Sequence, residues 1–129
     1  VLVGTVMQRF QGTCAERLNQ ATELVARVAE KAAAQHPDRG LDLVVLPEHA
    51  IQEGDSGSAQ SRAVPLKGPV LETFAHLART YGTNLILPVL LNEVAEGYGF
   101  SNSAVVLNRE GGIVGIYRKV FPVAEFGNP

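Results

Sequence analysis

Leu41-Asp42-Leu43-Val44-Val45-Leu46-Pro47-Glu48-His49-Ala50 is the stretch around which the rest of the chain is organised. Its apolar run contains β-branched residues and shows no alternation, which is typical of a strand covered on both faces. Pro47 has no backbone N–H to donate, so we expect the strand to end there. Glu48 would then follow the carboxyl end of a central strand. Ligands bind at that edge of open α/β sheets, so Glu48 is a candidate for chemistry, with a solvated loop acid as the alternative.

The composition indicates a globular chain with one core. Its 129 residues are 46% hydrophobic and 19% charged, which suits one domain and is too short for two ordinary ones. The formal net charge of −2 gives no reason to expect a nucleic acid partner. The longest apolar runs fall far short of the roughly 20 residues that span a bilayer, so we expect no membrane partner either. Cys14 is the only cysteine, which favours a reducing, cytoplasmic compartment.

Strand and helix patterns alternate along the first part of the chain. Residues 1–10 are rich in β-branched residues and predict a mostly buried strand. Thr13-Cys14-Ala15-Glu16 fits a capping box, so a helix is expected to begin there and to end at residues 36–40. Its apolar stripe contains Leu18, Ala21, Val25, Val28 and Ala32, and Arg17 is expected on the opposite, polar face.

The pattern continues after the central strand. Residues 52–67 show no period and predict a loop, and a second helix is expected from Gly68-Pro69 to Tyr81. Residues 84–91 predict a third strand, in which Pro88 indicates a bulge or an unpaired amide. The alternation of strands and helices predicts βαβ units with a mainly parallel centre.

The last part of the chain predicts strands only. Residues 93–99 form a polar connection, and residues 102–108 and 113–117 flank Arg109-Glu110-Gly111-Gly112. Two β-rich runs around a short turn that contains glycine predict a β-hairpin. The chain leaves this hairpin through Arg118 and Lys119.

Two segments resemble the nitrilase, or carbon-nitrogen hydrolase, superfamily. They are Leu46-Pro47-Glu48 after the buried strand, and residues 101–121, Ser-Asn-Ser-Ala-Val-Val-Leu-Asn-Arg-Glu-Gly-Gly-Ile-Val-Gly-Ile-Tyr-Arg-Lys-Val-Phe. The resemblance covers essentially the whole chain and corresponds to the N-terminal half of the family's domain. It implies an α/β fold, a nitrilase-like α-β-β-α sandwich. Residues 1–129, as the N-terminal portion of a single domain, would form about half of it: a mixed sheet, two helices on one face and a C-terminal β-hairpin.

The resemblance also implies the site residues. Glu48 matches the family's general base, and Lys119 matches the lysine that stabilises the tetrahedral intermediate. Glu125 falls near a second glutamate that orients the lysine or the substrate. The family's nucleophilic cysteine lies on a later strand-to-helix elbow, beyond Pro129, so we expect a longer polypeptide to carry the activity and this chain alone to be inactive.

The implied reaction and partners follow from the same resemblance. The family's enzymes are thiol hydrolases of non-peptide C–N bonds, which need no cofactor and no metal. The substrate would be a small molecule that contains an amide, carbamoyl or nitrile group, with an amide or N-carbamoyl group favoured. Family members commonly pair through a face of the sandwich, so a homo-oligomer is expected.

Several residues have alternative interpretations. Lys119 could be a surface lysine beside Arg118, and Glu125 could be a solvated loop acid. Cys14 lies near a helix N-terminus, where the helix dipole lowers a thiol pKa, but its position in a cap turn favours a structural or merely exposed cysteine over a nucleophile.

Two further alternatives concern the kind of site. The side chains of His49, Glu53 and Asp55 follow Glu48, but they fit no known spacing of metal ligands, and a solvated loop is favoured. The whole chain could also be a non-catalytic α/β domain that binds a small molecule or a partner. A cysteine after a short apolar strand beyond Pro129 would favour the enzyme over this binding domain.

Overall fold

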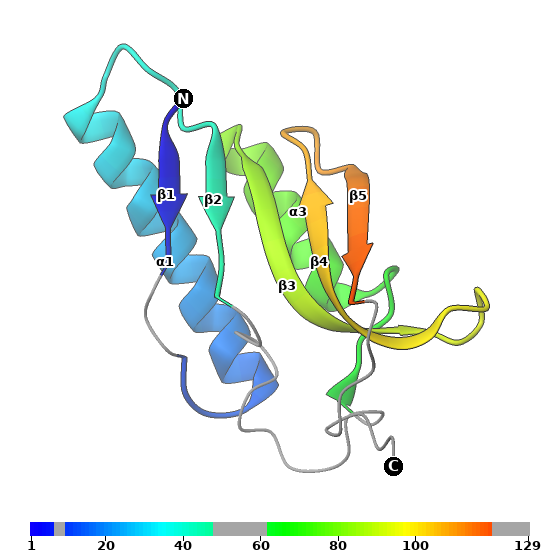
Figure 1. Ribbon diagram of the computed structural model, residues 1–129. Helices are drawn as coiled ribbons and strands as arrows, with labels where there is room; N and C mark the ends of the chain where they lie inside the picture. The colour runs from blue at the N-terminus through cyan, green and yellow to red at the C-terminus, as the bar shows by residue number, and fades with distance from the viewer. Residues whose placement is uncertain (7–9, 48–61, 120–129) are drawn as a thin grey trace.

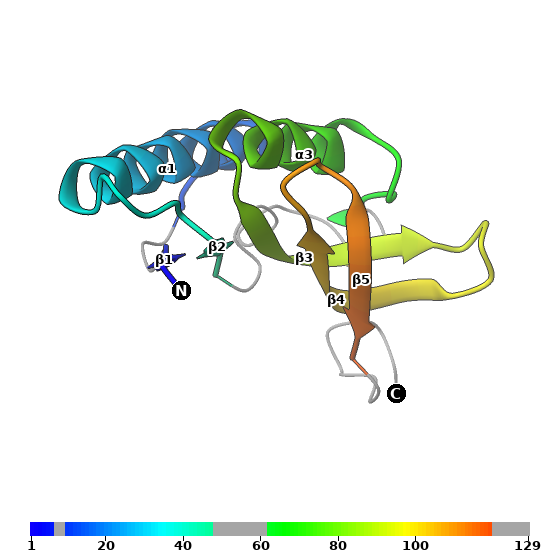
Figure 2. The same ribbon diagram turned by 90° about the horizontal axis from the view of Figure 1, so that it is seen from above.

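The computed structural model describes residues 1–6, 10–47 and 62–119, which form one mixed sheet with two helices. The strands are β1 (Val3–Thr5), β2 (Leu43–Val45), β3 (Asn84–Glu93), β4 (Gly99–Leu107) and β5 (Ile113–Arg118), in that order across the sheet. The helices are α1 (Cys14–Gln35) and α3 (Pro69–Tyr81), and both lie on one face of the sheet (Figures 1 and 2). The predicted α/β class, the two helices on one face and the C-terminal β-hairpin are therefore confirmed.

β2 lies inside the sheet, as its unbroken apolar run predicts. It pairs in parallel with β1 on one side and with β3 on the other, and Val44 is fully buried. After Val45 the pairing with β3 continues for one more hydrogen bond, from the N–H of Leu46 to the carbonyl of Ile86 at 3.1 Å. Pro47, the next residue, has no amide hydrogen with which to extend the ladder.

α1 begins where the capping box predicts. Thr13 is the N-cap: its hydroxyl accepts from the N–H of Glu16 at 3.2 Å, and the Glu16 carboxylate accepts from the N–H of Thr13 at 3.1 Å. One expectation on this helix is wrong, because Arg17 is buried instead of lying on a solvated face. In the first turn its guanidinium folds back, and its Nε donates to the carbonyl of Gly12 at 2.9 Å. A carbonyl outside the helix gives this side chain a partner that helical spacing does not predict.

α3 has the two ends that its sequence predicts. Pro69 occupies the first turn, where its missing N–H costs nothing, and Gly82 closes the helix with φ of 60°, in the left-handed region that glycine adopts most readily. Phe74 is fully buried between this helix and the sheet, where it joins Leu85 and Leu87 of β3 in the hydrophobic core.

β3, β4 and β5 form an antiparallel meander. β3 pairs with β4 from Leu85 to Glu93 without a register shift, so Pro88 sits in no bulge of that ladder. Pro88 lies after the last residue of β3 that pairs with β2 and before Leu91, which bridges Val64 in parallel. Of the two predicted interpretations, the unpaired amide is thus the one observed. The Val64 bridge also adds local order to a segment that the sequence predicts as a loop.

The face of the sheet away from the helices, the helix-free face, is mostly apolar. Residues that pair across a sheet share a face, and one such row runs through Val45, Ile86 and Val106. These side chains are half-buried, and Tyr117 on the same face of β5 is exposed. Among the described residues, neither helix covers this face (Figure 2).

Asp42, just before β2, connects the residue that precedes β1 with the turn between β4 and β5. Its Oδ2 accepts from the N–H of Leu2 at 2.8 Å, and its Oδ1 accepts from Nη2 of Arg109 at 2.7 Å. Arg109 also donates from Nε to the carbonyl of Gly82 at 2.8 Å, so the β4–β5 turn is held against the end of α3. The hydrogen bond from Leu2 and that from Arg109 both lower the pKa of Asp42 below its usual value.

We expect the replacement Asp42→Asn to lower the melting temperature in a pH-dependent way. Because the folded-state pKa is lowered, the stabilising effect of the carboxylate is fully present above the ordinary pKa of about 3.9 and is lost as the pH falls through the folded value. Thermal unfolding from pH 7 to pH 2 should show a melting-temperature difference that shrinks at the acid end. Asp38→Asn, at an exposed turn after α1, is the control. A difference that stays constant over this range would contradict the expectation.

Candidate active site

β2 and β5 both end at the same edge of the sheet, the one formed by the carboxyl ends of the parallel strands. β1, β2 and β3 are parallel, and two antiparallel pairings make β5 run in the same direction (Figure 1). The register places Val45 of β2 in one row with Gly115 of β5, through Ile86 and Val106. The chain therefore passes from β2 towards Glu48, and from β5 into Lys119, at one edge.

Lys119 is the candidate site residue that the structure describes. Its N–H donates to the carbonyl of Asn102 at 3.0 Å, which continues the β4–β5 ladder by one residue. Successive side chains of a strand point to opposite faces, so Lys119 shares the helix-free face with Tyr117. The Lys119 side chain is exposed and borders a pocket of about 210 Å³. The other residues of this pocket are Pro88, Asn102, Ser103, Ala104 and Tyr117.

Glu48 and Glu125 lie outside the described residues, as do His49, Glu53 and Asp55. The roles predicted for Glu48 and Glu125 therefore stay predictions, and the metal alternative near Glu48 is untested. Within the described ranges, no group of three or more His, Cys, Asp or Glu side chains could hold a metal ion.

Cys14 is the first residue of α1, where it is half-buried and packs against the hydrophobic core. This packing supports the structural interpretation of the cysteine.

The sequence patterns did not predict an ion pair next to Lys119, between a buried carboxylate and a half-buried guanidinium. Glu93, which the sequence places in a polar connection, is the last residue of β3 and is only 1% exposed. Arg118 donates to it from Nε at 2.8 Å and from Nη2 at 2.7 Å, one bond to each carboxylate oxygen. The guanidinium also lies over the ring of Tyr98, 3.9 Å from the ring centre. The hydrogen bonds to Glu93 raise the pKa of Arg118 above its usual value.

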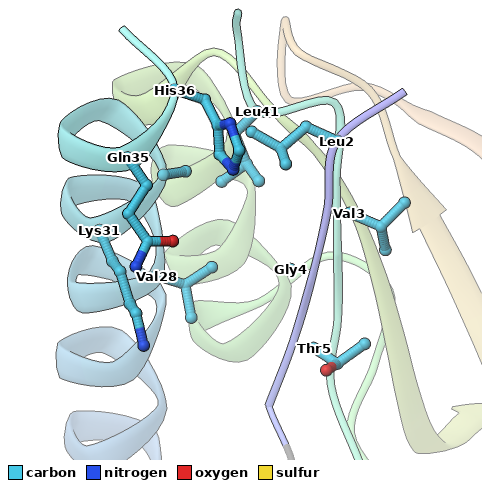
Figure 3. A pocket seen from close by; sticks show the side chains of 10 residues that line it. Leu2, Val3, Gly4, Thr5, Val28, Lys31, Gln35, His36 and Leu41 are labelled. Carbon is cyan, nitrogen blue, oxygen red and sulfur yellow. The ribbon is translucent and has the colours of Figure 1, made fainter.

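A second pocket lies at the opposite edge, near the amino end of β1 (Figure 3). It has a volume of about 260 Å³ between β1 and the last turns of α1. Leu2 and Val3 line it from the strand, and Gln35 and His36 line it from the helical side. It shares no residue with the pocket beside Lys119.

The described part of the chain contains no helix that is both long and apolar enough to cross a membrane.

The carbon-nitrogen hydrolase family model matches residues 7–129. The chain therefore belongs to the carbon-nitrogen hydrolase family, and the resemblance to the nitrilase superfamily drawn from its sequence is confirmed. No curated protein sequence matches the chain.

Several solved structures are similar in fold to this chain. A carbon-nitrogen hydrolase from Helicobacter pylori G27 is 24% identical, with a TM-score of 0.67 over 98% of this chain and 41% of that chain. Nit3 of Saccharomyces cerevisiae, a member of the nitrilase superfamily, is 22% identical, with a TM-score of 0.69 over 92% of this chain and 44% of its own. An N-terminal amidase with an Asn-Glu-Ala peptide is 18% identical, with a TM-score of 0.70 over 98% of this chain and 29% of that chain. The chain thus spans less than half the length of each.

Proposed function

We propose that the polypeptide to which this chain belongs is a thiol hydrolase of non-peptide carbon-nitrogen bonds. The observation that supports the proposal is the common edge at which β2 leads towards Glu48 and β5 leads into Lys119, in a chain of this family. We propose an amide or N-carbamoyl group, in preference to a nitrile, as the bond that is cleaved. Residues 1–129 would supply the base and the cation, and a cysteine beyond residue 129 would supply the nucleophile.

The proposed chemistry begins with the thiol. Glu48 takes its proton, because the thiolate is the effective nucleophile, and the thiolate then attacks the carbonyl carbon of the substrate. The electron pair of the carbonyl moves to its oxygen. When the intermediate collapses, Glu48 passes the proton to the leaving amine and a thioester remains. Glu48 then removes a proton from water, which attacks the thioester and forms a second tetrahedral intermediate. When this intermediate collapses, Glu48 returns the proton to the departing thiolate, and the acid and the free thiol are released.

Lys119 would stabilise the negative charge on the oxygen of each tetrahedral intermediate. A fixed ammonium is most effective for this purpose where water is excluded, because the local dielectric is then low. Pro88 and Ala104 form an apolar part of the pocket beside it, but Lys119 itself is exposed within the described residues. The proposal therefore requires other segments to cover the helix-free face. Glu125 is proposed to orient Lys119 or the substrate.

The test is ammonia release by the full-length polypeptide. The substrates are a simple aliphatic amide, an N-carbamoyl amino acid and an aliphatic nitrile, each assayed before and after alkylation of thiols. We expect release from the amide or the carbamoyl compound, loss of that release after alkylation, and none from residues 1–129 alone. Release by residues 1–129 that the replacement Cys14→Ser abolishes would contradict the proposed nucleophile. No release from any of the three would favour a non-catalytic binding domain.

A further inference from the structure

Glu93 and Arg118 join the ends of two strands that are not neighbours in the sheet. Glu93 is the last residue of β3, Arg118 is the last residue of β5, and β4 lies between them. Arg118 pairs with Ser103 of β4, whereas Glu93 pairs with Gly99 of the same strand. The guanidinium therefore reaches along β4 to meet the carboxylate at 2.7 and 2.8 Å.

Small residues of β4 leave space for the Arg118 side chain to extend along the strand. Gly99, Ser101 and Ser103 alternate along the strand and share the face on which Arg118 lies. The two serine hydroxyls are 2.7 Å apart and hydrogen-bonded to each other. Small side chains at three successive positions of one face let an arginine lie across the strand, which large side chains would prevent.

Tyr98, in the turn after β3, also contacts the Arg118 guanidinium. The N–H of Tyr98 donates to the carbonyl of Glu93 at 3.0 Å, and this bond closes the turn between β3 and β4. The Tyr98 ring then lies against the face of the guanidinium, while Glu93 binds its edge. Contacts on the edge and on the face together leave the Arg118 side chain little rotational freedom.

An ion pair with a buried carboxylate adds little to the free energy of unfolding. The Glu93 carboxylate is almost completely withdrawn from water, and the loss of its hydration offsets much of the attraction to Arg118. Apolar side chains of similar volume often stabilise a fold as well or better. What the pair supplies that apolar side chains do not is a fixed direction, because its two parallel hydrogen bonds define one geometry.

We propose that Glu93 and Arg118 are positioning residues for Lys119. Lys119 directly follows Arg118, and consecutive side chains of an extended chain point to opposite faces. Anchoring Arg118 on the helix-side face therefore fixes the Cα of Lys119 and directs its ammonium to the opposite face, into the pocket beside Tyr117. This proposal rests on the proposed function of Lys119.

The first test measures the anchoring without any reference to activity. In the full-length polypeptide with Glu93→Gln, hydrogen exchange at the Lys119 N–H, which donates to Asn102, is expected to rise by about tenfold or more. Exchange at the N–H of Gly115, which by the alternation along β5 points to β4 as that of Lys119 does, should stay the same. The matched control is Glu72→Gln, which breaks an exposed ion pair with Arg79 on α3. Unchanged exchange at Lys119 would overturn the proposal.

The second test measures the effect on the reaction. Glu93→Gln is expected to lower kcat by about 10- to 100-fold, because small displacements of a group that acts in the transition state cost that much, with KM changed by less than about threefold. In a Lys119→Ala background, the same replacement should lower the remaining kcat by less than about twofold. An equal loss of kcat in both backgrounds would show that Glu93 acts on the fold in general, and it would overturn the proposal.

Two further outcomes keep this inference separate from the proposed function. If exchange at Lys119 rises in Glu93→Gln while Lys119→Ala retains full activity, the anchoring stands and the proposed role of Lys119 fails. If Glu93→Gln does not fold, the double replacement of Glu93 and Arg118 by methionine removes both charges and retains apolar packing. That variant is expected to show the same rise in exchange at Lys119, and normal exchange there would overturn the proposal.

Discussion

Replacing Lys119 by alanine in the full-length polypeptide is expected to lower kcat by about 100- to 1,000-fold, the usual cost of losing one group that stabilises an oxyanion. The backbone should change little, because the contact of Lys119 with β4 is a main-chain hydrogen bond to Asn102 that alanine also makes. The measurement is steady-state release of ammonia, accompanied by thermal unfolding to show that the fold is retained.

Lys31→Ala is the matched control for this experiment. Lys31 is also an exposed lysine, but it lies on α1, near the opposite edge of the sheet. We expect Lys31→Ala to retain kcat within about twofold, as is usual for surface positions away from a site. If Lys119→Ala behaved in the same way, Lys119 would be a surface lysine at a strand exit, and the proposed mechanism would lose its cation.

The replacement Glu48→Gln is expected to have an effect of similar or larger size. Glutamine has nearly the same shape as glutamate but cannot accept the thiol proton, and general base catalysis contributes about 10²- to 10⁴-fold. We therefore expect kcat to fall within that range and alkylation of the nucleophilic thiol near neutral pH to become slower. Both rates are measured on the full-length polypeptide, with Glu30→Gln on the exposed face of α1 as control. Retention of both rates in Glu48→Gln would contradict the role of Glu48 as the base.

Local sequence signals predicted most of the elements. The β2 run, the capping box at Thr13, the proline and glycine at the two ends of α3, and the turn at Gly111 each depend on interactions within a few residues. Such interactions are readable from spacing and residue type. The parallel order of the first three strands followed from the alternation of strand and helix.

What the sequence did not reveal depends on distant partners. Glu93 looked like a loop acid, and it is buried because Arg118, 25 positions later, supplies its charge partner. Arg17 looked solvated, and it is buried because Gly12 supplies a carbonyl. The one local hint was the row of small residues on β4, which indicates that a large side chain crosses that strand.

The candidate site was predicted unevenly. The family resemblance identified Lys119, and the strand directions show why a residue after β5 can act at the same edge as a residue after β2. The catalytic roles of Lys119, Glu48 and Glu125 all remain predictions, and Glu48 and Glu125 lie outside the described residues. The neighbours of Lys119, above all Glu93 and Arg118, emerged only from the folded structure.

Intact-mass measurement of the full-length polypeptide, quenched within the first turnovers on an amide substrate, tests the central claim most directly. A thioester intermediate adds the mass of the acyl group to the protein, and peptide mapping locates it. We predict an adduct on a cysteine that follows residue 129, with less of it formed in the Lys119→Ala variant. Product formation without any adduct, or an adduct on Cys14, would contradict the account.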